Sequence, residues 1–134
     1  MQIISPDEGD RADFPGLGTR YLLRRDETDE QFALIEHTIP PRTLAAPTHV
    51  HEREDEFSYV LAGRVGVQVG DEEARLLELI SPPAFAAYFV DMAPVLSGDG
   101  PLDPERLRAI REKYGLSMDI ESRERLIEEH GLKA

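Results

Sequence analysis

Three side chains near the middle of the chain have the types and the spacing of a metal site. His49 and His51 are two residues apart, so on a β-strand both imidazoles point to the same face. Glu56 follows after a short polar stretch and opens an apolar run that ends at Gly63. Two imidazoles and one carboxylate are the donor set of mononuclear iron sites, and Zn²⁺, Ni²⁺ or Cu²⁺ can also occupy such a set. We therefore predict that His49, His51 and Glu56 bind one divalent metal ion.

Other residues near this motif leave alternatives open. His37 could replace one imidazole, although an exposed strand histidine is the simpler interpretation. Asp55 could take the place of the carboxylate ligand if the strand register shifts by one residue; otherwise residues 52–55 are predicted to be a solvated loop. Arg42 and Arg64 are the nearest cations in sequence and could hold a substrate carboxylate, but surface ion pairs are the more common role.

Short strands in the first 80 positions are expected to position this motif. Turn residues separate the apolar runs, as in a small barrel or sandwich. Pro40 and Pro41 end one strand, because proline lacks the N–H that a strand ladder needs. Phe57 and Tyr59 alternate with Glu56, so they should face away from the metal and pack under a helix or a partner chain. We expect strands over residues 20–24, 31–39, 49–51, 57–61, 65–69 and 74–80, with a turn at 70–73.

The last third of the chain predicts helices. Ser81 precedes two prolines and is the expected N-cap of the first helix. Asp103 starts a second helix that stops at Gly115, and a third helix runs from about 121 to 130 and ends at Gly131. One face of the first helix is apolar and must be buried; it consists of Phe85, Tyr88, Phe89 and Met92.

Composition limits the class of protein. A length of 134 residues predicts one domain with a single core. The net charge of −12 argues against sequence-independent nucleic-acid binding and against docking on anionic lipid. The chain has no cysteine, no long apolar run and no signal-peptide pattern, so we expect a soluble cytoplasmic protein. We expect a flexible N-terminal tail at 1–15, a β-barrel portion at 16–80, and a helical segment at 81–134 that packs on the barrel or on a partner chain.

The stretch from Pro47 to Gly63 resembles the first sequence motif of the cupin superfamily. That motif reads His-x-His, three or four residues, Glu, six residues, Gly, and these positions are present here. The family's opening glycine, six residues before the first histidine, is replaced by Thr43. The resemblance extends over roughly residues 16–116 and is to small single-domain, conserved-barrel, quercetin-dioxygenase-like cupins. It implies a mainly β fold with C-terminal helices, built on a double-stranded β-helix or jelly-roll barrel. It also implies dimerisation through sheet contacts.

One part of the family pattern is missing from the sequence. Cupins usually supply a further histidine in a second motif, yet the chain has no histidine between His51 and His130. Residues 69–78 run directly into what reads as the last strand. We predict that about two strands are missing, by a natural or an engineered deletion, and that the barrel is incomplete in one chain. Dimerisation, exchange of strands or helices, or helix docking would then complete or cover its open edges.

The resemblance implies two classes of function. The first is a metal-dependent oxygenase or isomerase acting on a small organic molecule, with weak or no activity because the missing segment normally supplies a ligand and a cavity wall. The second is a non-catalytic small-molecule-binding or assembly module without bound metal. The expected ion is Fe, Mn, Ni or Zn. The expected partner is a second copy of the chain, as a homodimer or higher homo-oligomer, with neither nucleic acid nor membrane.

Overall fold

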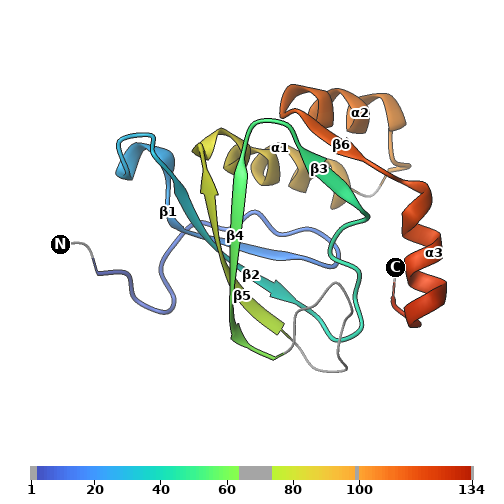
Figure 1. Cartoon of the computed structure of the whole chain (residues 1–134), viewed down its shortest axis with the longest axis horizontal. Coiled ribbons are helices and arrows are strands. Elements are labelled where there is room, and N and C mark those ends of the chain that lie inside the picture. Colours follow the sequence, from blue (N-terminus) through green and yellow to red (C-terminus); the bar gives the residue numbers. More distant parts are fainter. Residues whose placement is uncertain (1–2, 64–73, 99, 134) are drawn as a thin grey trace.

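The chain forms two antiparallel sheets and a C-terminal group of helices (Figure 1). The computed structural model describes residues 3–63, 74–98 and 100–133. The larger sheet has the strand order β1-β2-β5-β4, and the smaller sheet pairs β3 with β6. The strands are β1 (Gly18–Leu23), β2 (Ala33–Ile39), β3 (His49–His51), β4 (Asp55–Ala62), β5 (Ala74–Ser81) and β6 (Leu116–Met118). The expected mainly β fold with C-terminal helices is confirmed.

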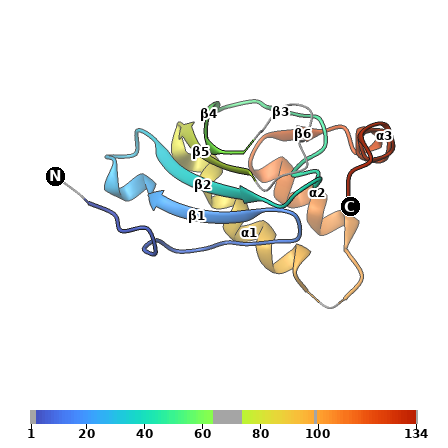
Figure 2. The same ribbon diagram turned by 90° about the horizontal axis from the view of Figure 1, so that it is seen from below.

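Strand register decides which side chains of the larger sheet face inward. Glu56 on β4 lies opposite Ile80 on β5, and Ser58 lies opposite Glu78. Ile35 on β2 is also paired with Glu78. Because directly paired residues share a face, these side chains line one side of the sheet. The short 3-10 helix η2 (Pro83–Ala86) and the helix α1 (Ala87–Leu96) cover this inner face (Figure 2).

The core lies between the sheet and these two helices. Phe85, Tyr88, Phe89 and Met92 are all buried there, which confirms the predicted apolar helix face. The ring of Phe89 meets His37 of β2 edge-on, with 5.0 Å between ring centroids. The predicted cap is wrong, since Ser81 is still paired with Asp55 as the last residue of β5.

The remaining elements connect the helices to the small sheet. The helix α2 (Pro104–Lys113) starts at Asp103, whose side chain accepts hydrogen bonds from two backbone N–H groups of the first turn. The helix α3 (Glu121–His130) ends at Gly131 in the left-handed conformation. Both boundaries agree with the prediction. Strand β6 lies between these helices and was not predicted, because three residues carry no recognisable periodicity. No helix in the described part of the chain is long and apolar enough to cross a membrane.

The N-terminal segment makes more contacts than a loose tail would. The backbone N–H of Ala12 donates to Thr19, and that of Tyr21 donates to Asp10, so residues 10–14 run beside β1. The ring of Phe14 then stacks on that of Phe89 in α1, with 6.3 Å between ring centroids. The division into segments 1–15, 16–80 and 81–134 itself stays a prediction.

The described residues do not form a closed barrel. Within them, β4 pairs with β5 on one side only, and Phe57 and Tyr59 on its outer face are 62% and 70% exposed. The prediction that these two rings pack under a helix of the same chain is therefore wrong, and the partner alternative stays a prediction. The predicted strand at 65–69 and turn at 70–73 lie outside the described residues. The absence of the second cupin motif consequently also stays a prediction.

Candidate metal centre

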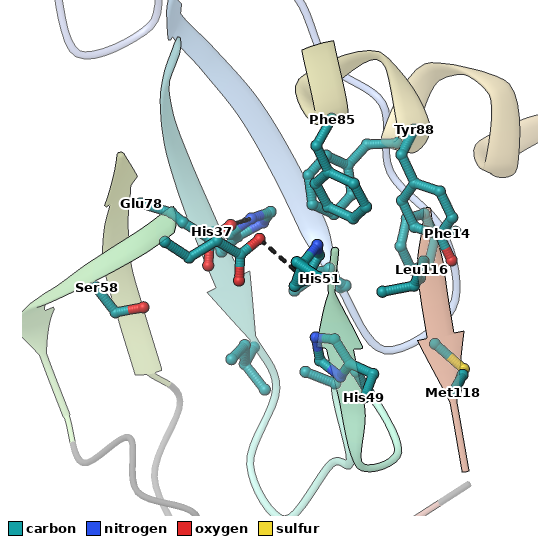
Figure 3. A pocket seen from close by; sticks show the side chains of 16 residues that line it. Phe14, His37, His49, His51, Ser58, Glu78, Phe85, Tyr88, Leu116 and Met118 are labelled. Carbon is teal, nitrogen blue, oxygen red and sulfur yellow. Dashed lines mark hydrogen bonds and ion pairs between the residues drawn. The ribbon is translucent and has the colours of Figure 1, made fainter. Parts of the chain in front are cut away.

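The two histidines of the predicted site come from the short strand β3. This strand is held by β6, with His49 opposite Met118 and His51 opposite Leu116. A further backbone hydrogen bond from Glu52 to Gly115 fixes the end of β3. Figure 3 shows both imidazoles pointing from β3 toward the space under the larger sheet. The unpredicted β6 is therefore the element that positions the His-x-His motif.

The structure brings all three predicted ligands together. His49, His51 and Glu56 each offer one ligand atom, and these atoms lie within 4.8 Å of one another. The closest approach joins His51 Nε2 to Glu56 Oε1 at 3.3 Å. Neither of the alternative ligands belongs to this group, since Asp55 is exposed on the other face of β4 and His37 bonds elsewhere.

Hydrogen bonds prepare His49 to act as a ligand. Its Nδ1 lies 2.8 Å from the carbonyl oxygen of Pro47, which can only accept, so Nδ1 carries the proton and donates. The lone pair of the neutral ring is then on Nε2. Metal-binding histidines characteristically use their second nitrogen in this way.

His51 is buried without the hydrogen bonds that such burial normally requires. Both ring nitrogens are buried, and neither makes a well-aligned hydrogen bond to a described residue. Burial lowers the pKa of the imidazole, and neighbouring His49 lowers it further, which favours the neutral, metal-binding form. The ring packs edge-on against Phe85, with centroids 4.2 Å apart. A buried imidazole with unused nitrogens fits a metal ligand.

Glu56 is also in an unfavourable environment without a cation. Burial, together with the carboxylates of Glu78 and Glu54, raises the pKa of its carboxyl to about 7. A divalent ion between Glu56 and the two imidazoles would satisfy the carboxylate charge and both rings at once. The donor set, with room for water or substrate, suits Fe, Mn, Ni or Zn. The residues present therefore fit a bound metal.

Glu54 is a second buried carboxylate beside His51. Its side chain is 2% exposed, and its Oε2 lies 4.0 Å from Nδ1 of His51 without a hydrogen-bond partner among the described residues. Burial raises the pKa of this carboxyl as well. The predicted solvated loop at 52–55 is thus wrong for Glu54, whose side chain turns inward behind the imidazole. The acidic run in the sequence gave no sign of which carboxylate would be buried.

His37 and Glu78 form a pair on the inner face of the sheet. His37 is 3% exposed, so its interpretation as an exposed histidine is wrong. Its Nε2 lies 2.8 Å from Glu78 Oε2, and its Nδ1 lies 3.2 Å from the hydroxyl of Thr19. Glu78 was missed as a site residue, although its alternation with Leu77 and Leu79 on a predicted strand could have indicated an inward carboxylate.

The metal group and the His37–Glu78 pair line one cavity of about 250 Å³. Its remaining walls are mostly aromatic and aliphatic, and include Phe14, Phe85, Tyr88, Phe89, Leu116 and Met118 (Figure 3). Ligand sites are typically apolar cavities with a few placed polar groups, and this volume is at the small end of their range. The arrangement can hold an ion and a small organic molecule side by side.

Neither of the two arginines proposed as anion partners is among the described residues that line this cavity. Arg42 Nη2 donates to the carbonyl oxygen of Gly131 at 2.6 Å and so joins the end of α3. Arg64 lies outside the described residues.

Comparison with known proteins agrees with the sequence resemblance. A family model described as "Cupin domain" matches residues 35–78, a range that runs from β2 to β5 and includes the metal group. No match was found among curated proteins. The family match and the antiparallel sheet architecture both support membership of the cupin superfamily.

Proposed function

We propose that this protein is a metal-dependent cupin that binds a small organic ligand beside the ion. The observation that carries the proposal is His51, whose buried ring nitrogens make no hydrogen bond to a described residue and lie next to a carboxyl group with a raised pKa. Such an arrangement is costly for a fold unless a ligand completes it. A divalent cation is the simplest group that satisfies two imidazoles and a carboxylate together.

The chain's own residues would divide the work as follows. His49, His51 and Glu56 would hold the ion, which when bound supplies Lewis acidity or activates oxygen. The aromatic wall from η2 and α1 would exclude water and pack against the organic ligand. The Pro47 carbonyl would keep His49 in the binding tautomer. The fold does not choose among oxygenase, isomerase and decarboxylase chemistry, so the reaction class is left to substrate screening.

A non-catalytic binding module is the second candidate. It is favoured by the absence of a closed barrel among the described residues, because an incomplete wall weakens the positioning that catalysis needs. In that case the cavity binds a small molecule without turnover and chelators leave the stability of the fold unchanged.

We further propose a homodimer or higher homo-oligomer. Among the described residues, β4 has one unpaired edge, and its outer face exposes Phe57 and Tyr59. An edge strand with exposed aromatic residues is a site for pairing with another chain. Light scattering should give a mass of at least twice 15.1 kDa, and Tyr59→Glu should lower it. A monomer at every concentration would contradict this.

The test of the metal proposal is a titration of metal-stripped protein with Zn²⁺ and Fe²⁺ by calorimetry, alongside elemental analysis of the protein as purified. We expect one ion per chain, and loss of binding in the His49→Ala, His51→Ala double variant. His130→Ala at the end of α3 is the matched control and should bind normally. The absence of saturable binding by the unmodified chain would contradict the metal site and favour the non-catalytic module.

A further inference from the structure

The side of the cavity formed by β2 and β5 carries a fixed hydrogen-bond acceptor. Glu78 projects from β5 on the inner face, between Ser58 of β4 and Ile35 of β2. One of its oxygens, Oε2, is bonded to Nε2 of His37 at 2.8 Å. Since that oxygen accepts, Nε2 carries the proton, and Nδ1 can accept from the Thr19 hydroxyl 3.2 Å away.

This hydrogen-bond chain fixes the orientation of Glu78. Oε1 of Glu78 has no hydrogen bond to a described residue, and Glu78 lines the cavity (Figure 3). A carboxylate oxygen accepts hydrogen bonds, so Oε1 is available to a donor group on a ligand. Its neighbour His37 is itself held between Thr19 and the ring of Phe89, which fixes the position of the acceptor.

The lining of the cavity combines carboxylates with three histidines. Glu56 and Glu78 both line it, and no arginine or lysine is among the described residues that do so. A divalent ion in the proposed site would balance these two carboxylates. In the metal-free cavity, a ligand carboxylate would bring a further negative charge into a largely apolar space that no described arginine or lysine lines, which is costly.

The apolar walls suit a cation as well as an aromatic group. Phe85 and Tyr88 stack with 4.9 Å between centroids, and both line the cavity together with Phe89. Aromatic faces attract ammonium groups, and more strongly where water is excluded. The cavity of about 250 Å³ is large enough for a single small ring with a short substituent.

We propose that the cavity selects small, largely apolar amines, whose ammonium group donates to Glu78, and that it rejects carboxylates of the same shape. This inference rests on the proposed function in that it names the ligand class of the same site. It assigns Glu78 as the specificity-determining residue and His37 as the residue that positions it.

The experiment compares benzylamine with benzoate, two probes of similar shape and opposite charge, by calorimetry and by two-dimensional NMR. Each is titrated into Zn²⁺-loaded and into metal-stripped protein. We expect benzylamine to bind about tenfold more tightly than benzoate in metal-stripped protein, where no ion can coordinate the benzoate carboxylate, because a hydrogen bond to a charged group contributes roughly this factor. NMR shifts should fall on cavity residues.

Three variants separate the role of Glu78 from the overall acidity of the chain. Glu78→Gln keeps an acceptor for His37 but removes the charge, and should reduce the benzylamine preference to within about twofold. Glu128→Gln removes the same charge from an exposed position on α3 and should leave the preference unchanged. Ser58→Lys, at the exposed position paired with Glu78, should shift the preference toward benzoate.

The outcomes distinguish this inference from the metal proposal. Zn²⁺ binding within about threefold of normal in Glu78→Gln would show that this residue acts on the ligand and not on the ion. Failure to bind Zn²⁺ would defeat the metal proposal yet leave the probe comparison valid in metal-stripped protein. In metal-stripped protein, benzoate binding as tightly as benzylamine, an undiminished preference in Glu78→Gln, or no saturable binding of benzylamine would overturn the inference.

Discussion

Each face of the larger sheet carries a partly or fully buried carboxylate, and the two carboxylates differ in their charged neighbours. On the outer face, Glu36 is covered by the guanidinium groups of Arg20 and Arg75, both of which bond to its oxygens. On the inner face, Glu56 faces two imidazoles and further carboxylates, with no described cation lining its cavity. The same residue type thus serves two purposes within one sheet.

The pKa values express this difference. Burial acts to raise the pKa of Glu36, but hydrogen bonds from Arg20 and Arg75 outweigh burial and hold it below the ordinary value. Burial and the nearby carboxylates together raise the pKa of Glu56 to about 7. The outer carboxylate is completed by the chain itself. The inner one has no described arginine or lysine beside it in the cavity, which is the difference that the proposed metal site would explain.

The largest expected effect is on the outer face. Glu36→Gln should lower the free energy of unfolding by about 3 kcal/mol, because it leaves the largely buried Arg20 without its counter-charge. Urea denaturation measures this. Glu30→Gln, at an exposed pair with Arg25, is the control and should change stability by less than about 0.5 kcal/mol. If the two substitutions changed stability equally, the ion pairs of Glu36 would not have the structural role given to them here.

On the inner face, Glu56→Gln should weaken Zn²⁺ affinity by at least about 100-fold. A ligand carboxylate contributes more than an outer-shell partner, whose loss typically costs 10–100-fold. Calorimetric titration above neutral pH measures this in comparison with Glu36→Gln, which should bind Zn²⁺ normally once folded. Unchanged affinity in Glu56→Gln would mean that the carboxylate is not a ligand.

The same variant should have the opposite effect on the metal-free fold. The folded-state pKa of Glu56 is raised from 4.5 to about 7, so the unfolded chain loses this proton first. The metal-free protein therefore loses stability as the pH rises from about 4.5 to 7, and the whole penalty is present above 7. Glu56→Gln should then raise the free energy of unfolding at about pH 8 by roughly 2 kcal/mol and have little effect at about pH 4. A loss of stability at both values would contradict the account.

The smallest expected effect concerns Glu54. Its carboxylate lies behind His51, so Glu54→Gln should lower Zn²⁺ affinity by about tenfold through the orientation and basicity of the imidazole. Glu52→Gln, two residues away and exposed, is the matched control for the loss of charge. If both variants bind equally well, Glu54 does not support the site.

Features that depend on residues close together in the chain, such as spacing on a strand and helix ends, could be predicted from the sequence. The spacing of His49, His51 and Glu56 indicated a shared face, and the structure places their ligand atoms together. Asp103 and Gly131 likewise indicated the ends of α2 and α3.

What could not be predicted depends on contacts between distant segments. The pairing of β3 with β6 joins residues more than sixty positions apart, and three-residue strands leave no pattern. His37 was misjudged because its burial depends on Phe89, Glu78 and Thr19, which come from three other elements. The exposed rings of Phe57 and Tyr59 show that alternation gives the face of a side chain but not what covers it.

The most direct test of the central claim is to titrate the side-chain carboxyl groups of Glu36 and Glu56 by ¹³C NMR in metal-stripped protein. We expect Glu56 to titrate near pH 7 and Glu36 below its ordinary range, and we expect Zn²⁺ to keep Glu56 ionised at lower pH. An ordinary pKa for Glu56 that Zn²⁺ does not change would contradict that claim.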